Sequence, residues 1–550
     1  MRGMSILSPG MSAVAVLAFC AAALLCAGCA SNPPSSGGTP PPVTPPTLTT
    51  YYLNCSAATD GSGTQAAPWN SPNDVNSHIF TAGNSLLINR GTTCNGSLQL
   101  LGSGASGSPV IVDAYGTGSA PVINGGSSNQ ALLLNSESYW EINNLEIVGG
   151  VNYGVLVTGG IAATPINHIY LKNLNVHGAT FTSVSRGDSG EVFMSANGIG
   201  ETLNDILVDG VTAGPSQVSE GIAITGGGGW VGNSSQPLGN NITVQNSTAH
   251  DVYGDGILLL ETTNGIVQNS VVYNSGLCPS CGSTPSGLWE WWCETCTIQF
   301  NESYSNHSWE SYDGGDFDID FYNTGNIVQY NYGHDSDGYC TAFFGAENTV
   351  DTNNVFRYNI CSNNERKASE ASQGDVNLAT WDGGSLSGVQ VYNNTFYWNP
   401  AAPAPLLNAD GPSYTGNLAN FFSNNIIYST VPQMISANSN FTLDNNIYWQ
   451  VGGGAPQWLW NGQTYTSLAS YQAASSQDAK SQATDPLLVN PTNDATGMPT
   501  TAFTLQAGSP ALGTGVNVCA GISGCTMGTQ DFFGNPLPAS GAGLNIGAFQ

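Results

Sequence analysis

Apolar and polar residues alternate along short segments through most of the chain. In each segment valine, isoleucine, tyrosine or phenylalanine takes every second position, and glycine, asparagine, aspartate or serine stands at the ends. Such alternation is typical of half-buried strands, and the end residues are those that favour turns. Helical spacing does not occur between the segments. The pattern therefore predicts an all-β protein made of many short strands.

An asparagine follows the apolar part of these segments roughly once every thirty residues. The series comprises Asn144, Asn173, Asn246, Asn269, Asn301, Asn331, Asn359, Asn394, Asn425 and Asn446, and Gly210 takes the asparagine's place in ILVDGVTA. From Asn246 onward the steps are 23, 32, 30, 28, 35, 31 and 21 residues. A period of this length indicates stacked repeats, and repeats made of strands indicate a parallel β-solenoid. We expect each asparagine to tolerate left-handed backbone at a turn and to bond its amide to the neighbouring coils.

The chain resembles the right-handed parallel β-helix, or pectin-lyase-like, superfamily over residues 51–550. The opening YYLNCSAATDGSGTQAAPW, with GNSLLINRGTT and SGSPVIVDAYGTGSAPVING after it, is similar to the first strand and coils of exported polysaccharide-processing members. The closing DPLLV, FTLQAGSPALGTG and DFFGNPLPASGAGLNIGAFQ is similar to their last coils. The resemblance implies one domain of roughly eleven or more coils. It does not identify a reaction, because one fold hosts many chemistries.

The first fifty residues have the features of an export signal and a spacer. Arg2 precedes an apolar run from Met11 to Leu25, and LCAGC ends at Cys29. Residues 1–29 resemble a bacterial lipoprotein signal with Cys29 as the lipidated residue, although Cys26 stands where leucine is usual; ordinary cleavage and free secretion is the alternative. The proline-rich residues 30–50 predict a semi-rigid linker. We expect a protein of the bacterial cell envelope or the extracellular space.

Ten cysteines remain beyond the signal segment, an even number that favours disulfides in an exported chain. Cys278, Cys281, Cys293 and Cys296 form CPSC and CETC, a spacing that could also hold structural zinc. Disulfides are favoured over zinc because the compartment is oxidising and the other cysteines also fall into pairs. These pairs are Cys55 with Cys94, Cys340 with Cys361, and Cys519 with Cys525.

The formal net charge is −29, with eight lysines and arginines in the whole chain. This composition excludes nucleic acid as a partner, because its binding needs clustered basic residues. A bare polyanionic sugar would also be repelled unless Ca²⁺ or a local basic patch reversed the field. Neutral glycans meet no such repulsion.

Acidic and aromatic residues concentrate between Asp251 and Asp382, most densely in DFDIDF. If Phe317, Ile319 and Phe321 point into the helix, alternation places Asp316, Asp318 and Asp320 on the outer face. Crowded carboxyl groups separate into a protonated acid and an ionised base, as glycoside hydrolysis requires.

The spacing of these carboxyl groups leaves two mechanisms open. Outward residues along one strand are about 6.7 Å apart and neighbouring coils about 4.8 Å. Pairs within DFDIDF therefore suit an inverting glycosidase, whereas Glu290 with Asp318 on adjacent coils would suit a retaining one. His334 is the candidate to assist the carboxyl groups by orienting water or donating a proton, with Asp335 and Asp337 beside it in GHDSDG. The tryptophans that could stack on sugar rings are Trp289, Trp291, Trp292 and Trp309. Singly, each of these residues has a structural alternative, as a turn aspartate or a core tryptophan.

Arg366 and Lys367 in NNERKASEASQGD are the candidates for a different reaction. Polysaccharide lyases of this superfamily commonly abstract the proton next to a uronate carboxyl with a lysine or arginine, often aided by Ca²⁺. Arg366 would lower the pKa of Lys367, but Glu365 and Glu370 would raise it, so the local charges do not favour a lysine base. Both residues otherwise qualify as ligands for substrate or as partners of nearby acids.

The prediction from sequence is an exported, lipid-anchored, monomeric β-helix that cleaves a polysaccharide, with hydrolysis by paired carboxylates ahead of β-elimination. A non-catalytic glycan-binding surface protein is the third class. Hydrolysis by carboxylates requires no cofactor, Ca²⁺ remains open, and no other metal is assigned. The membrane is expected to be contacted only through the N-terminal lipid.

Overall fold

The computed structural model describes one compact unit of the chain, Leu48–Gln550. The described residues are 48–181, 189–228, 236–278, 285–308, 312–367, 373–492, 497–498, 501–538 and 543–550. The predicted signal, with Cys29, and the linker up to residue 47 lie outside them. Within the described ranges, no helix has the length and hydropathy that crossing a membrane requires.

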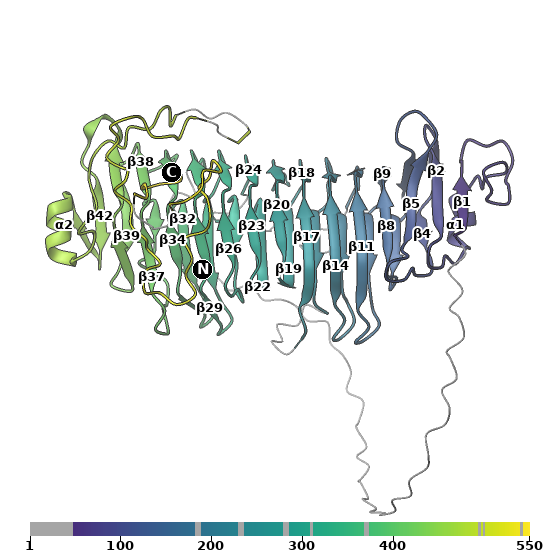
Figure 1. Ribbon diagram of the computed structural model, residues 1–550, viewed down its shortest axis with the longest axis horizontal. Coiled ribbons are helices and arrows are strands. Elements are labelled where there is room, and N and C mark those ends of the chain that lie inside the picture. The colour runs from purple at the N-terminus through teal and green to yellow at the C-terminus, as the bar shows by residue number, and fades with distance from the viewer. Residues whose placement is uncertain are drawn as a thin grey trace, which may run out of the picture. The chain divides into compact units, whose positions relative to one another are not determined.

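Each turn of the chain contributes strands to three columns, which we number 1, 2 and 3 in the order in which the chain passes through them from β4 onward (Figure 1). Column 1 contains β4 (Leu98–Leu100), β7 (Gln130–Asn135), β10 (Tyr153–Thr158), β13 (Gly190–Ser195), β16 (Glu220–Thr225), β19 (Asp255–Thr263), β22 (Leu288–Glu294), β25 (Phe317–Ile319), β28 (Thr341–Gly345), β32 (Val376–Thr380), β36 (Leu407–Asn408), β39 (Gln433–Ala437) and β42 (Gln457–Trp460). Column 2 contains β1 (Thr50–Leu53), β2 (Ser85–Asn89), β5 (Val110–Tyr115), β8 (Trp140–Asn143), β11 (Ile166–Lys172), β14 (Leu203–Asp209), β17 (Gly239–Gln245), β20 (Ile266–Gln268), β23 (Thr297–Gln299), β26 (Ile327–Gln329), β30 (Val355–Arg357), β34 (Gln390–Tyr392), β37 (Asn420–Ser423) and β40 (Phe441–Asp444). Column 3 contains β3 (Thr93–Asn95), β6 (Val122–Gly126), β9 (Glu146–Gly149), β12 (Asn175–His177), β15 (Thr212–Ala213), β18 (Thr248–His250), β21 (Val271–Tyr273), β24 (Glu302–Tyr304), β27 (Tyr332–His334), β31 (Ile360–Ser362), β35 (Thr395–Trp398), β38 (Ile426–Ser429) and β41 (Ile447–Gln450).

Within each column, successive strands pair in parallel. Column 3 is a 13-stranded sheet, and columns 1 and 2 join in a 28-stranded sheet through β17 and β19. β29 (Val350–Thr352) pairs with β33 (Ser385–Ser387), and β43 (Gln463–Tyr465) pairs antiparallel with β42. The helical elements are α1 (Pro72–Asn76), α2 (Leu468–Ser475) and the 3₁₀ turn η2 (Val451–Gly453). This arrangement confirms the predicted all-β, right-handed parallel β-helix.

The coils enclose a core filled by every second residue of each strand. Ile257, Leu288 and Phe317 face one another across β19, β22 and β25, and all three are fully buried. Stacking like side chains in register buries a continuous apolar column without help from other elements. The core therefore runs through the interior of the coils, and function has to be carried by the outer faces.

The asparagine series divides between two adjacent positions of the repeat. Asn144, Asn173, Asn246 and Asn269 have φ near +50° to +60°, and Gly210 at +66° belongs to the same column. From the next coil onward this left-handed position is held by Phe300, Tyr330, Tyr358, Asn393, Asn424 and Asn445. The expected left-handed turn is thus confirmed for the first members of the series, whereas Asn301 and the members after it lie one residue further along.

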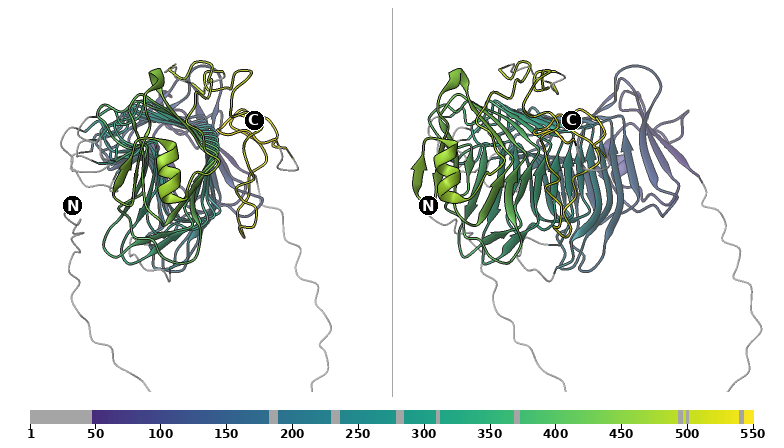
Figure 2. Two further views of the ribbon diagram at one scale, coloured as in Figure 1. Left: turned by 90° about the vertical axis from the view of Figure 1, so that its left-hand side faces the viewer. Right: turned by 60° about the vertical axis from the view of Figure 1, so that its left-hand side comes forward.

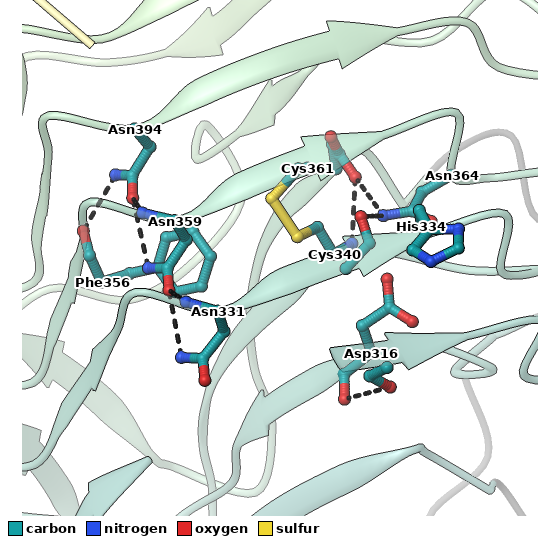
Figure 3. Close-up of a disulfide and its surroundings, with 12 residues drawn as sticks. Asp316, Asn331, His334, Cys340, Phe356, Asn359, Cys361, Asn364 and Asn394 are labelled. Atoms are coloured by element: carbon teal, nitrogen blue, oxygen red, sulfur yellow. Dashed lines mark hydrogen bonds between the residues drawn. A yellow bond between two sulfur atoms is a disulfide. The ribbon is translucent and has the colours of Figure 1, made fainter. Parts of the chain in front are cut away.

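Those later asparagines form a buried ladder inside the coils. The backbone N–H of Asn301 donates to the side-chain oxygen of Asn331 at 2.9 Å, and the Asn331 amide donates to Ile298 O and to Asn359 Oδ1, both at 3.0 Å. Figure 3 shows the ladder continuing through Asn359 and Asn394. Each side chain therefore satisfies backbone groups of the coils on both sides, as predicted for the amides.

The last part of the chain covers the coils in two ways. α2 lies across the end of the coil stack (Figure 2), where Tyr471 stacks on Trp458 with ring centres 5.5 Å apart. The chain beyond residue 485 forms no strand among its described residues. It runs instead along the outside of columns 3 and 2, with Phe503 and Ile546 packed against Tyr332 and Ile426. The closing segments resemble the last coils of the superfamily, but in this structure their described residues form no coil. They cover coils that are formed by earlier parts of the chain.

Three predicted disulfides are confirmed. Cys55–Cys94, Cys340–Cys361 and Cys519–Cys525 have Cα–Cα distances of 5.2, 5.9 and 5.1 Å. Cys340 directly precedes β28 and Cys361 lies on β31, 21 residues later, so this bond links the first and third columns of one coil and does not pin consecutive coils as expected (Figure 3). Bonds of this kind form in oxidising compartments, which fits an exported protein.

The CPSC and CETC cysteines agree with the predicted disulfides only in part. Cys278 is disulfide-bonded, and Cys281 lies outside the described residues. Cys293 and Cys296 are buried free thiols, so the disulfides predicted for them are wrong. They occupy ladder positions: their backbone N–H groups donate to Asn323 and Asn326, and each thiol points at a carbonyl of the preceding coil.

Candidate active site

Asp318 lies on the outer face of column 1, as predicted. β25 places it in register with Trp289 on the coil before and Ala342 on the coil after. Its neighbours Phe317 and Ile319 point into the core. Asp318 is only 5% exposed, so a carboxyl group stands on a largely covered part of this face.

Tyr339 links Asp318 to a second carboxyl group. Its hydroxyl lies 3.1 Å from Asp318 Oδ2 and 3.3 Å from Asp313 Oδ1, and Ser286 Oγ is 3.1 Å from it on another side. Burial, and then the charges of Asp313 and Asp318, raise the pKa of Tyr339 well above its usual value. The phenol therefore keeps its proton and can donate to either carboxylate.

The separation of Asp313 and Asp318 is limited by this shared hydroxyl. Two oxygens that lie 3.1 and 3.3 Å from one atom are closer together than the roughly 6.5 Å at which inverting glycosidase pairs begin. The site extends along the column, because Ser286 N–H donates to Asp255 Oδ1 at 2.7 Å. Asp255 is fully buried.

Tryptophans adjoin the carboxyl pair on the same face. Trp289 and Trp291 of β22 pack with Trp292 and with Phe321, and Trp291 meets Phe321 edge to face at 5.8 Å. Trp309 lies outside the described residues. The predicted neighbourhood of Asp318 and aromatic rings is therefore present for Trp289 and Trp291.

Asp316 does not line the outer face, contrary to prediction. β25 begins at Phe317, so the alternation that holds inside the strand does not extend to residue 316. The carboxylate of Asp316 points inward and accepts hydrogen bonds from Ser336 Oγ at 2.6 Å and Asn306 Nδ2 at 3.0 Å. Burial raises its pKa well above the usual value. Asp316 belongs to the polar interior of the coil.

Glu290 also differs from the predicted pairing, and Asp320 lies just beyond the strand. Glu290 is in register with Leu259 and Ile319, both core residues, so it faces the interior and does not meet Asp318. Asp320 follows the end of β25, and its carboxylate accepts a hydrogen bond from the N–H of Phe321 at 2.9 Å. The crowding of three outward aspartates is thus absent from this strand.

His334 lies on a different face from Asp318. It stands on the outer side of column 3, stacked on Tyr304 with ring centres 4.9 Å apart, and its side chain is 1% exposed. Its ring nitrogens face Asp335 at 2.7 Å and Glu302 at 3.2 Å. Burial lowers the pKa of His334, but the bonds to Asp335 and Glu302 outweigh it and raise the pKa to about 9. The structure therefore does not bring His334 to the carboxyl pair as an assistant.

Asp337 and Lys367 lie nearer to the pair, around Ser308. Asp337 Oδ2 accepts the backbone N–H of Ser308 at 3.2 Å, Lys367 Nζ donates to the Ser308 carbonyl, and Ser308 Oγ donates to the carbonyl of Tyr312, next to Asp313. Arg366 is exposed, and its guanidinium donates to the carbonyl of Asn399.

Sequence reasoning missed Asp313 and Tyr339. Asp313 precedes the strand in a glycine-rich turn, where an aspartate has an ordinary structural role. Tyr339 is 26 residues further along, in the next coil. The acidic cluster around DFDIDF was the available signal for Asp313, but nothing in the sequence predicts the bridging tyrosine.

Comparison with known proteins supports the fold, and the sequence similarity covers only part of the chain. No protein-family model matches the chain. A stretch of 229 residues, 38% of this chain, is 29% identical to a lacto-N-biosidase of Bifidobacterium longum subsp. longum, and it spans only 13% of that relative.

Among solved structures, a GH136 lacto-N-biosidase from Eubacterium ramulus aligns over 72% of this chain and 67% of that one, with a TM-score of 0.51 and 16% identity. This likeness supports the β-helix fold. Pectate lyase Pel9A aligns over 92% of this chain and 96% of that one at 16% identity, but its TM-score of 0.43 adds nothing to the argument.

Proposed function

We propose that this protein is an exported glycoside hydrolase that cleaves a polysaccharide or oligosaccharide with Asp318 and Asp313. The observation that carries the proposal is the hydroxyl of Tyr339 shared between these two carboxyl groups on the outer face of column 1. The 29% identity to a lacto-N-biosidase over part of the chain supports hydrolysis over the alternatives.

We assign the pair a retaining mechanism, because the two oxygens that share the Tyr339 hydroxyl lie closer together than the carboxyl groups of inverting enzymes. Asp318, fixed on β25, attacks the anomeric carbon while Asp313 protonates the leaving oxygen; Asp313 then takes a proton from the water that releases the sugar. The first step needs one of the two carboxyl groups protonated, and the proximity of like charges favours that arrangement. Tyr339, which stays protonated, stabilises whichever carboxyl group is ionised.

Trp289 and Trp291 would form the apolar wall beside the reacting bond. Their positions one coil before Asp318 place aromatic rings next to the carboxyl pair. Sugar rings have apolar faces that pack on such surfaces. We also propose that the protein is a monomer, that lipid on Cys29 anchors it to the envelope, and that hydrolysis requires no metal, with Ca²⁺ left open.

The test is a glycan panel that includes oligosaccharides containing lacto-N-biose. The wild-type protein should create reducing ends without the ultraviolet absorbance of an unsaturated uronate. Asp318→Asn and Asp313→Asn should each lower the rate by about 10² to 10⁴ while the melting temperature stays close to wild type.

Two controls separate this proposal from its rivals. Asp320→Asn changes the same kind of group just beyond the pair and should remain active. Lys367→Ala should also remain active, because a lysine base belongs to elimination. An active Asp318→Asn variant together with a folded but inactive Lys367→Ala variant would reject hydrolysis in favour of a lyase. If the wild type binds glycans without cleaving any of them, the protein is a glycan-binding module. A newly released sugar with inverted anomeric configuration would reject the retaining mechanism.

A further inference from the structure

Behind the tryptophans of β22, three potential metal ligands converge inside the coil. Glu290, Cys293 and Cys296 offer one carboxylate oxygen and two sulfur atoms that all lie within 4.8 Å of one another. They are spaced three residues apart, and Trp292 and Thr295 between them have φ of +51° and +56°. Two left-handed turns in this corner therefore carry residues 290, 293 and 296 to the same side of the chain.

Glu290 is the feature of this cluster that ordinary packing does not explain. It is fully buried between Leu259 and Ile319 of the apolar core. Neither of its carboxylate oxygens has a hydrogen-bond partner among the described residues. Burial raises the pKa of this carboxyl group and outweighs the Asn326 amide, which interacts with it and lowers its pKa; the amide's hydrogen bond goes to the carbonyl of Cys293 at 3.0 Å. An unpartnered buried carboxyl group is costly, and its neighbours in space are two thiols.

One backbone donor is placed to stabilise a metal-bound thiolate at Cys296. The backbone N–H of Gly265 donates to Cys296 Sγ at 3.3 Å, the kind of bond that a thiolate accepts. Cys293 Sγ lies 3.3 Å from Leu259 O, and Cys296 Sγ lies 3.4 Å from Thr262 O. One of these carbonyls, or a water molecule, could complete four ligands.

We propose that Glu290, Cys293 and Cys296 form a closed, structural zinc site in the interior of the β-helix. Two thiolates and one carboxylate are typical ligands of tetrahedral Zn²⁺, whereas Ca²⁺ and Mg²⁺ prefer oxygen alone. Sulfur atoms bound to one zinc ion lie roughly 3.8 Å apart, so the side chains have to close by about 1 Å or less. The ion would replace the missing partners of Glu290 and fix the strand that carries Trp289 and Trp291 on its outer side.

The test is the zinc content of the full-length protein, purified under non-reducing conditions, saturated with ZnCl₂ and dialysed. Wild type should retain close to one equivalent. Cys293→Ser/Cys296→Ser should retain none, and Glu290→Gln should bind zinc at least tenfold more weakly. Cobalt in place of zinc should give a sulfur-to-metal charge-transfer band in wild type that the double variant lacks.

The controls distinguish loss of the zinc site from misfolding and from zinc bound elsewhere on the protein. Serine at residues 293 and 296 retains a hydroxyl donor for the facing carbonyls, and Ser247 and Ser270 already occupy ladder positions elsewhere, so the double variant should fold. Cys519→Ser/Cys525→Ser removes an exterior pair and should leave zinc binding unchanged. Zinc retained by the Cys293→Ser/Cys296→Ser variant, a Cys293–Cys296 disulfide in the purified protein, or no zinc in folded wild type would each overturn the proposal.

Discussion

Replacing Asn331 by alanine tests whether the buried asparagine ladder holds the coils together. Asn331 is fully buried; its side-chain oxygen accepts the backbone N–H of Asn301, and its amide donates to the carbonyl of Ile298. The alanine leaves both backbone groups without these partners in an interior that excludes water. Each such loss costs about 1–3 kcal/mol, and the cavity adds to it, so we expect a loss of roughly 3–5 kcal/mol in the free energy of unfolding.

Two matched variants separate the ladder from the turn beside it. Asn331→Ser retains an oxygen that can accept the N–H of Asn301, as Ser270 accepts that of Ser247 at 3.2 Å, and should lose about half as much. Asn246→Gly alters the left-handed column, where Gly210 already stands, and should change stability by about 0.5 kcal/mol or less.

Urea denaturation followed by circular dichroism, with disulfides intact, gives the midpoints and slopes. Hydrogen exchange of the Asn301 amide gives a local readout, because this N–H loses its acceptor in Asn331→Ala. The reasoning is refuted if Asn331→Ala is destabilised no more than Asn246→Gly, or if the Asn301 amide stays as protected as in wild type.

Three further predictions concern pH, a disulfide and export. Burial raises the pKa of Asp375 from 3.8 to about 7; its stabilising contribution is therefore complete below about pH 4 and is lost as pH rises through 7. Between pH 4 and 7 the wild type should lose up to about 4 kcal/mol of free energy of unfolding through this group. Asp375→Asn should flatten the matching fall in melting temperature, and an unchanged slope would contradict this. Cys340→Ser/Cys361→Ser opens a link between residues 21 apart and should lower the free energy of unfolding, measured by urea denaturation, by about 3 kcal/mol; no loss would show that the coils alone hold this region. Cys29→Ala should move the protein from the membrane fraction to the soluble fraction with activity intact, and a wild type already found in culture fluid would rule out the lipid anchor.

The fold could be predicted from the sequence because each coil repeats the same alternation of apolar and polar residues in its strands. Alternation places Phe317, Asp318 and Ile319 correctly, since these three residues are β25. It misplaces Asp316, because strand length cannot be read from the alternation itself, and one residue beyond the strand the backbone turns the side chain inward. Short strands thus limit how far a period-two argument reaches.

The asparagine series and the site show a second limit. Asn269 and Asn301 look equivalent in sequence, yet the first holds a left-handed turn and the second a buried ladder one position later. Similar asparagines at adjacent positions conceal a shift of one residue. The contact of Tyr339 with Asp313 depends on the register between two coils separated by loops of unequal length, and no local pattern records that register.

The segment beyond residue 485 changes how this solenoid can unfold. In a simple stack each coil meets only its neighbours, so ends can fray one coil at a time. Here the backbone N–H of Gly497 reaches Glu302 on β24, 195 residues earlier, and Asn424 exchanges hydrogen bonds with Val516. Coils between these points cannot detach singly without releasing the segment that spans them. The later part of the helix should therefore melt as one cooperative block, and it can reach its full stability only after the last residues of the chain have been made.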